Sequence, residues 1–178
     1  ELLYAFLRIL PCKRVILPVP SYVDYARAAK VAGLPVVALT LAEEDDFTLN
    51  LDALGALLQA GDLVIIATPN NPTGKDVDRW QLLSLVKDYP ASYFLIDEAF
   101  ADFIEESLTL GGKTQNILTL NSMTKFYGVP GLRIGYGILS PSLAMQVREN
   151  LPPWTVNSLA QAVGTAALQD TAYQAKTR

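Results

Sequence analysis

Lys125 is the residue whose type and neighbours most directly suggest a chemical role. It follows the apolar residues 117–120, and two hydroxyl residues and an arginine lie near it in the sequence: Ser122, Thr124 and Arg133. A lysine amine at the end of a buried strand can form a Schiff base with a carbonyl compound, while hydroxyls and a guanidinium can bind an anionic group beside it. A lysine taken alone is most often a solvated surface residue. The combination predicts a covalently bound cofactor that carries an anion, and pyridoxal phosphate needs both features.

Asp97 is the candidate partner for a cation. It directly follows the apolar residues 93–96, and a carboxylate buried there without a partner would have a raised pKa and would cost stability. A protonated pyridine nitrogen would supply the positive charge, and the ring would then accept electrons from the substrate Cα. A helix cap or a structural ion pair explains Asp97 equally well by itself. Glu98 is expected on the opposite face because successive strand residues alternate.

Arg133 is the candidate partner for an anion. It stands between Leu132 and Ile134, so it is expected to enter an apolar strand, where a guanidinium needs a negative partner. A phosphate, also bound by the hydroxyls of Ser122 and Thr124, would be such a partner. A carboxylate in the core is the alternative.

Asn71 and Tyr22 are weaker candidates. Asn71 lies in the turn-rich residues 70–74 and could donate a hydrogen bond to a ring oxygen, but such residues form turns in many proteins and the turn interpretation is favoured on spacing alone. Tyr22 could stack on a flat ring, and Tyr25 could approach the same pocket from one helical turn further on. Aromatic residues at this spacing are as often part of a core.

The elements that must position these residues alternate along the chain. Together they predict a mostly parallel α/β sheet with helices on both faces, in three layers and without an internal domain boundary. In such sheets ligands bind at the carboxyl ends of the strands, where the candidate residues fall. The predicted strands are residues 15–17, 36–41, 63–67, 93–96, 117–120 and 134–139, and the predicted helices are residues 22–32, 51–59, 76–87, 142–150 and 156–168.

The amino-acid composition argues against several classes of protein. The 178 residues are 51% hydrophobic with a net charge of −4, which is typical of a globular protein and offers no basic surface for nucleic acid. There is no histidine, so the usual metal-ligand clusters cannot form, and the single cysteine, Cys12, cannot make an internal disulfide. Apolar runs such as residues 63–67 are far shorter than a membrane span. We therefore expect a cytoplasmic protein that binds neither membrane nor metal.

The motifs around these residues resemble those of the fold-type I, aspartate-aminotransferase-like pyridoxal-phosphate enzymes. The resemblance covers nearly the whole chain and implies Lys125 for the covalent link to pyridoxal phosphate and Asp97 for the pyridine nitrogen. It further implies Asn71 for the ring hydroxyl, Tyr22 for stacking, and Ser122, Thr124 and Arg133 for the phosphate. By the same resemblance, residues 1–178 are expected to be the cofactor-binding large domain of a homodimeric enzyme, truncated at both ends and lacking the small C-terminal domain.

Two segments, residues 97–103 and 153–157, most resemble the branch of this family that decarboxylates threonine phosphate for cobalamin biosynthesis. Phe100 stands where many transaminases of the family have a tyrosine, and Asn157 is the implied substrate contact. The branch of histidinol-phosphate aminotransferases is the alternative. A regulatory module that binds a ligand without turnover is a third possibility, which the presence of Lys125, Asp97 and Arg133 disfavours. The substrate is expected to be an amino acid, phosphorylated in both enzyme branches.

Overall fold

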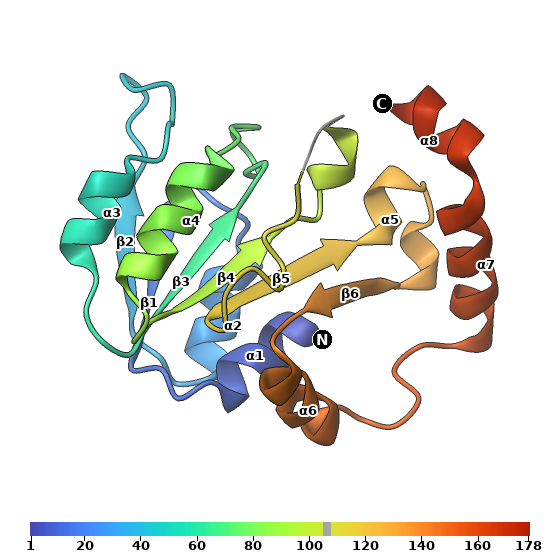
Figure 1. Cartoon of the computed structure of the whole chain (residues 1–178), viewed down its shortest axis with the longest axis horizontal. Helices are drawn as coiled ribbons and strands as arrows, with labels where there is room; N and C mark the ends of the chain where they lie inside the picture. The colour runs from blue at the N-terminus through green and yellow to red at the C-terminus, as the bar shows by residue number, and fades with distance from the viewer. Residues whose placement is uncertain (105–107) are drawn as a thin grey trace.

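A six-stranded sheet forms the centre of the computed structural model, which describes residues 1–104 and 108–178 (Figure 1). The strand order is β2-β1-β3-β4-β5-β6; the first five strands of this order run parallel, and β6 is antiparallel to β5. The predicted α/β sheet is thus confirmed. The strands are β1 (Arg14–Val19), β2 (Val36–Thr40), β3 (Asp62–Ala67), β4 (Tyr93–Asp97), β5 (Ile117–Ser122) and β6 (Gly135–Ile138).

Both faces of the central strands are buried because successive side chains enter two different cores. In β3, Leu63 and Ile65 pack on one side with helices α1, α2 and α6, whereas Val64 and Ile66 pack on the other with α3 and α4. Each such side chain contributes about 1.5–3 kcal/mol when fully buried. The predicted three-layer arrangement follows from this near-continuous apolar composition.

Helices α2, α3, α4, α6 and α7 lie close to the predicted positions, whereas α1, α5 and α8 fall outside the predicted ranges. The bounds are α1 (Leu2–Ile9), α2 (Asp24–Val31), α3 (Leu51–Leu57), α4 (Arg79–Asp88), α5 (Met123–Phe126), α6 (Pro141–Asn150), α7 (Ser158–Gln169) and α8 (Thr171–Thr177). Polar side chains fix the starts of α3 and α4: Asn50 accepts from Ala53 N at 2.9 Å, and Asp78 accepts from two backbone amides at 2.9 Å. Such caps are worth about 1 kcal/mol each.

Strand β6 runs antiparallel to β5, so the segment that joins them lies at the carboxyl edge of the parallel strands. Only the short helix α5 and the 3-10 helix η2 (Pro130–Leu132) separate β5 from β6, so the chain returns without the crossover that a parallel strand needs. Gly135 permits this close return, since a Cβ there would lie 2.5 Å from the Asn121 carbonyl oxygen. Helices α7 and α8 lie beyond β6, with the C-terminus near α5 (Figure 1).

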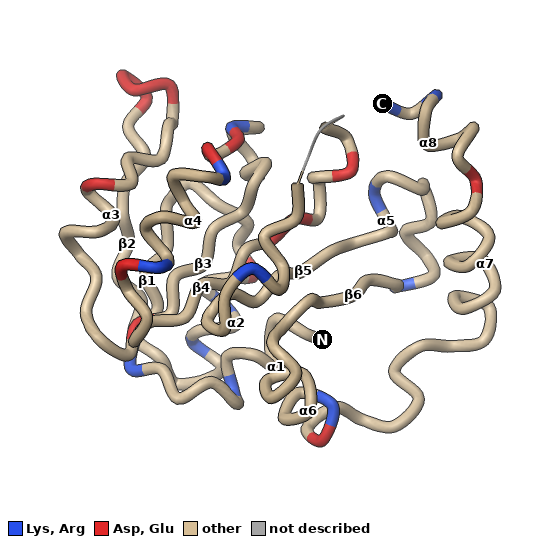
Figure 2. Tube along the Cα trace, viewed as in Figure 1, with Lys and Arg blue, Asp and Glu red and all other residues tan. Residues whose placement is uncertain are grey.

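Charged groups are spread over the fold. Lysines and arginines are dispersed along the chain, whereas acidic residues gather in the loop between β2 and α3, residues 43–46 (Figure 2). In the two described ranges, no helix is long and apolar enough to cross a membrane.

Candidate active site

The predicted functional residues lie along the carboxyl edge of the sheet. Asp97 is the last residue of β4, Ser122 is the last residue of β5, and Lys125 lies in α5 directly after it. Tyr22 follows β1 and Asn71 follows β3. Parallel strands β1, β3, β4 and β5 therefore deliver these residues to one edge, as the sequence predicted.

Asp97 is half-buried, and two neutral hydrogen-bond donors contact its carboxylate. Its Oδ2 accepts from the Tyr25 hydroxyl at 2.7 Å, and its Oδ1 accepts from the Ala99 backbone amide at 2.9 Å. Among the described residues, no lysine or arginine forms an ion pair with it. The hydroxyl of Tyr25 comes from α2, where this side chain is only 2% exposed.

Burial raises the pKa of Asp97, while the hydrogen bonds from Tyr25 and Ala99 and the positive charge of Lys125 act in the opposite direction. A raised pKa means that the carboxylate lacks sufficient stabilisation of its charge. A cationic N–H that approached the free lone pairs of Asp97 would supply it. The donor set therefore fits the protonated ring nitrogen of pyridoxal phosphate.

Lys125 presents its amine at the surface, close to two hydroxyls. Its Nζ donates to Ser122 Oγ at 3.0 Å, and Ser122 Oγ lies 2.8 Å from Thr124 Oγ1. The lysine side chain is exposed, whereas Met123, Thr124 and Phe126 in the same short helix are buried. The helix is thus anchored by its neighbours while the amine remains accessible.

Aromatic rings surround the turn that carries Lys125. The Phe100 ring centroid lies 5.9 Å from Lys125 Nζ, so a ring without a hydroxyl lies beside the lysine. Phe126 packs edge-on against Phe103 at 5.1 Å, and the Tyr173 hydroxyl of α8 donates to the Phe126 carbonyl oxygen at 3.0 Å. These contacts hold α5 against Phe103 and α8.

Arg133 differs from its predicted environment. It does not enter an apolar strand: it is exposed, it precedes β6, and its backbone has φ 52° and ψ 50°, in the left-handed region. Its Nη1 donates to the Pro130 carbonyl oxygen at 3.2 Å, and no carboxylate among the described residues forms an ion pair with it. The pattern Leu-Arg-Ile suggested a strand, but the chain is still turning at this point. An arginine held in a strained conformation of this kind is more typical of a binding site than of a packing role.

Tyr22 lies beside Tyr25, with their ring centroids 5.6 Å apart in an edge-to-face arrangement. Its hydroxyl donates to Asp24, which is the main cause of its raised pKa, and the charge of Arg133 acts in the opposite direction. The ring is 44% exposed, which leaves a face accessible for stacking. Tyr22, Tyr25 and Asp97 thus form one contiguous group.

Two predicted residues are not joined to this group by contacts between described residues. Asn71 is exposed in its turn, where the neighbouring Asn70 makes the hydrogen bonds, donating to Thr73 and to the Pro20 carbonyl oxygen. Asn157 caps α7 by accepting from Ala160 N at 2.8 Å. The cap explains its side chain without a substrate.

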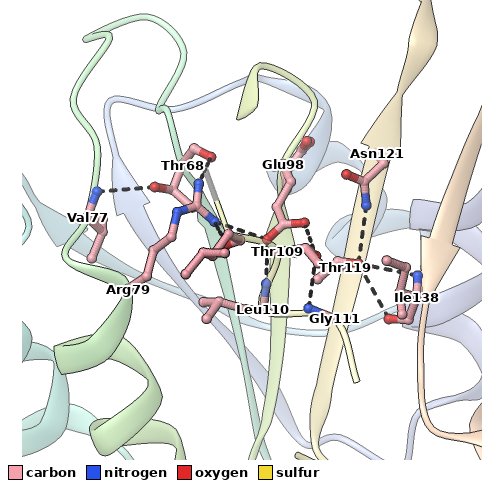
Figure 3. Close-up of polar contacts among 12 residues, drawn as sticks. Thr68, Val77, Arg79, Glu98, Thr109, Leu110, Gly111, Thr119, Asn121 and Ile138 are labelled. Atoms are coloured by element: carbon pink, nitrogen blue, oxygen red, sulfur yellow. Dashed lines mark hydrogen bonds and ion pairs between the residues drawn. The ribbon is translucent and has the colours of Figure 1, made fainter. Parts of the chain in front are cut away.

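Sequence reasoning missed two contributors. Tyr25 was noted only as a ring, although its hydroxyl bonds Asp97 across 72 residues. Arg79 was not singled out, yet it forms a buried ion pair with Glu98 at 3.1 Å on the far face of β4 (Figure 3). Glu98 does face away from Asp97, as the strand period predicted. Arg79 could have been singled out because it lies in the first turn of the predicted helix 76–87, which follows the loop that carries Asn71.

Residues 1–177 match the sequence model of the family described as aminotransferase class I and II. A threonine-phosphate decarboxylase of Salmonella typhimurium is 38% identical over 93% of this chain and 47% of its own length. A histidinol-phosphate aminotransferase of Symbiobacterium thermophilum is 34% identical over 94% of this chain and 47% of its own length. The chain thus spans about half the length of the curated relatives that it matches.

Solved structures agree with these matches. The crystal structure of the histidinol-phosphate aminotransferase from Clostridium acetobutylicum has a TM-score of 0.89 to this chain and 28% sequence identity. The likeness covers 99% of this chain and 54% of that one. The sheet and helices described above therefore form an aminotransferase-like α/β fold.

Proposed function

This chain belongs to the family of class I and II aminotransferases, whose members depend on pyridoxal phosphate, and we propose that it is the cofactor-binding large domain of a longer, homodimeric enzyme acting at the Cα of an amino acid. The observation that carries the proposal is that a partly desolvated carboxylate with a raised pKa, Asp97, lies at the same edge of the sheet as an accessible amine, Lys125. These are the two groups that the cofactor requires at opposite ends of its ring system.

In this proposal Lys125 is the residue that binds the cofactor covalently, and Asp97 bonds its ring nitrogen. Support for Lys125 comes from its exposed amine on an otherwise buried helix, next to Ser122. Support for Asp97 comes from its burial and from two neutral donors that fix the direction of its carboxylate. Tyr25, as one of these donors, orients the carboxylate and keeps its charge available to the ring nitrogen.

The phosphate is proposed to bind at Ser122, Thr124 and Arg133. The two hydroxyls lie 2.8 Å apart, and the guanidinium of Arg133 is free of any carboxylate partner among the described residues. Two hydroxyl donors with one guanidinium are a suitable donor set for a dianion. Tyr22 would cover the ring, and the Asn71 amide would donate to the ring oxygen.

Bound pyridoxal phosphate supplies an electron sink for the bonds at the substrate Cα. Asp97 keeps a proton on the ring nitrogen, which maintains that sink. The Lys125 amine would be the group placed to move a proton to or from the substrate Cα. The Phe100 ring limits the access of water to one side of the amine, and Ser122 holds Nζ in position.

For the complete enzyme we propose decarboxylation of L-threonine O-3-phosphate. Identity is somewhat higher to the decarboxylase relative than to the aminotransferase relative, and Phe100 lies beside Lys125 without a hydroxyl. The second candidate is transamination of a substrate such as histidinol phosphate, which is supported by the TM-score of 0.89 to the histidinol-phosphate aminotransferase structure. The two reactions differ in which bond at Cα is broken.

The test uses the full-length enzyme with pyridoxal phosphate. Borohydride reduction followed by peptide mapping should place the cofactor on Lys125; labelling elsewhere, with Lys125 unmodified, contradicts the site. Incubation with threonine phosphate should release carbon dioxide and aminopropanol phosphate. Glutamate formation from histidinol phosphate and 2-oxoglutarate at a faster rate, without carbon dioxide in the first assay, would establish the aminotransferase instead. Labelling at Lys125 without turnover of either substrate would favour a ligand-binding module.

A further inference from the structure

A buried ion pair that the proposed function does not use lies directly behind Asp97. The side chain of Glu98 is 1% exposed and that of Arg79 is 11% exposed, and Arg79 Nη1 donates to Glu98 Oε1 at 3.1 Å. Glu98 also accepts from Thr109 Oγ1 at 2.6 Å and from Leu110 N at 2.9 Å (Figure 3). Because Glu98 follows Asp97 in sequence, this network is attached to the residue next to the proposed ring-nitrogen partner.

Arg79 also reaches the loop that carries Asn71, which we define as residues 69–76. Its Nη2 lies 3.4 Å from the Thr68 carbonyl oxygen, at the start of this loop, and 3.8 Å from Asp76 Oδ1, at the end. One guanidinium therefore contacts both ends of the Asn71 loop and the strand end of β4. A planar group with several donors in fixed directions can do this, and a lysine cannot.

Thr68 closes the loop on itself. Its hydroxyl donates to the Asp76 carboxylate and accepts from Val77 N at 3.1 Å, while its backbone amide donates to the Asp97 carbonyl oxygen at 2.9 Å. The two ends of the Asn71 loop are thus held together, and both are held to the residue that carries the Asp97 carboxylate. The exposed Asn71 lies on a loop with fixed ends.

A buried ion pair is an inefficient source of stability, because the cost of removing two charges from water offsets much of their attraction. Apolar residues in the core between α4 and β4 would serve stability as well. What apolar residues could not provide is a directional link among three chain segments. This favours a positioning role for the pair.

We propose that Arg79 and Glu98 are positioning residues that fix the Asn71 loop relative to Asp97, so that the Asn71 amide reaches the ring oxygen while Asp97 bonds the ring nitrogen. The inference rests on the proposed function, since it needs the cofactor to lie between these two residues. In this proposal, the Arg79–Glu98 pair lies on the face of β4 away from the cofactor. It sets the distance between Asn71 and Asp97, which contact the cofactor on the other face.

The experiment measures the visible absorption of pyridoxal phosphate bound to the full-length enzyme as a function of pH. The absorption reports the proton on the nitrogen that joins Lys125 to the cofactor. Without the Asn71 donor, the ring oxygen keeps more negative charge, which stabilises that proton and raises the pH midpoint. We expect Arg79→Lys, which preserves the charge, to raise the midpoint by about half a pH unit or more, the size expected for one weakened hydrogen bond.

Two further variants connect the effect to Asn71. Asn71→Ala should raise the midpoint at least as much as Arg79→Lys, and the double variant should match Asn71→Ala alone, because both changes remove the same contact. If Arg79→Lys does not fold, Glu98→Gln replaces it. Loss of a negative charge alone would lower the midpoint in Glu98→Gln, so a rise there also supports positioning.

The matched control is Asp62→Asn, which weakens another buried pair of arginine and carboxylate, formed with Arg14 at 2.8 Å at the opposite edge of the sheet. It should lower the melting temperature without changing the midpoint. An unchanged midpoint in Asn71→Ala or in Arg79→Lys, or additive shifts in the double variant, overturns the inference. A wild-type enzyme that does not acquire the absorption band contradicts the proposed function itself, and so the two failures are distinguishable.

Discussion

The amino edge and the carboxyl edge of the sheet each have an aspartate and an arginine. The two residues form an ion pair with each other at the amino edge but not at the carboxyl edge. At the amino edge, Asp62 accepts two bonds from Arg14, at 2.8 and 3.0 Å, and one from Gln59 N at 2.7 Å. Arg14 also donates to the Leu57 carbonyl oxygen at 2.8 Å. At the carboxyl edge, Asp97 has two neutral donors and no cation, and Arg133 has no anion among the described residues.

This difference distinguishes charged groups with a structural role from charged groups that remain available to bind a ligand. At the amino edge, each charge is satisfied within the chain, so there is little to gain from binding anything else. At the carboxyl edge, the half-buried Asp97 has a raised pKa and the Arg133 guanidinium has no carboxylate partner among the described residues, so both would gain from a molecule with a cationic nitrogen and an anionic group. The carboxyl edge is therefore the edge at which we propose that the cofactor binds.

The largest expected effect follows removal of the amine at the carboxyl edge. Lys125→Ala in the full-length enzyme should lower the rate at the substrate Cα by about 10³-fold or more, because the covalent link and the proton carrier are both lost. Steady-state assays with threonine phosphate and with histidinol phosphate measure the rate. Asp62→Asn, at the amino edge, should leave the rate per folded molecule unchanged. A comparable loss of rate in both variants would remove the functional distinction between the edges.

A smaller loss is expected when the unpaired carboxylate is removed. Asp97→Ala should still permit the cofactor to bind at Lys125 but should reduce the rate on the order of 10²-fold or more, if the carboxylate supplies roughly 3 kcal/mol of charge stabilisation. Borohydride fixation checks binding and the same assays check the rate. A rate near that of the wild type would be incompatible with the assigned role of Asp97.

A more conservative change tests the hydrogen bond that orients Asp97. Tyr25→Phe removes the hydroxyl 2.7 Å from Oδ2 and keeps the ring, so the rate should fall about 10-fold, in line with a loss of about 1–1.5 kcal/mol. Tyr4→Phe, on α1 at the same face of the sheet, is a control for loss of a phenol hydroxyl. Equal rates in wild type and Tyr25→Phe would show that Ala99 N alone orients the carboxylate.

The smallest effect is on the stability of the cofactor-free enzyme. Since burial raises the pKa of Asp97 in the folded state, its contribution to stability is fully present below the ordinary carboxyl pKa of about 4. That contribution is lost as pH rises through the raised value. Urea unfolding over this range should show a free energy of unfolding that falls with pH more steeply in wild type than in Asp97→Ala. Parallel curves would mean that Asp97 is already well stabilised without a cation.

Much of the fold was predictable because its determinants are local. Buried strands such as β3 are continuous apolar runs in the sequence. The alternation of side chains along β4 correctly predicted that Asp97 and Glu98 lie on opposite faces of the sheet. The carboxyl-edge position of Lys125 then followed from the general location of sites in parallel sheets. The assigned roles of the site residues remain predictions for the experiments above.

Other features depend on distant parts of the chain and gave no local signal. The partner of Asp97, the Tyr25 hydroxyl, lies on a helix whose spacing predicts only a core face. Arg133 was expected in a strand because its neighbours are apolar, but the return to antiparallel β6 begins two residues later. Arg79 and Glu98 meet only when α4 packs on β4. Each of these required tertiary structure.

The adjacency of Asp97 and Glu98 makes the length of β4 as important as its composition. A substitution within residues 93–96 alters packing on one face only. A deletion of a single residue there would turn Glu98 toward the cofactor side and Asp97 toward Arg79, exchanging the two carboxylates in one step. Over evolutionary time, this strand should therefore accept changes of side chain far more readily than insertions or deletions.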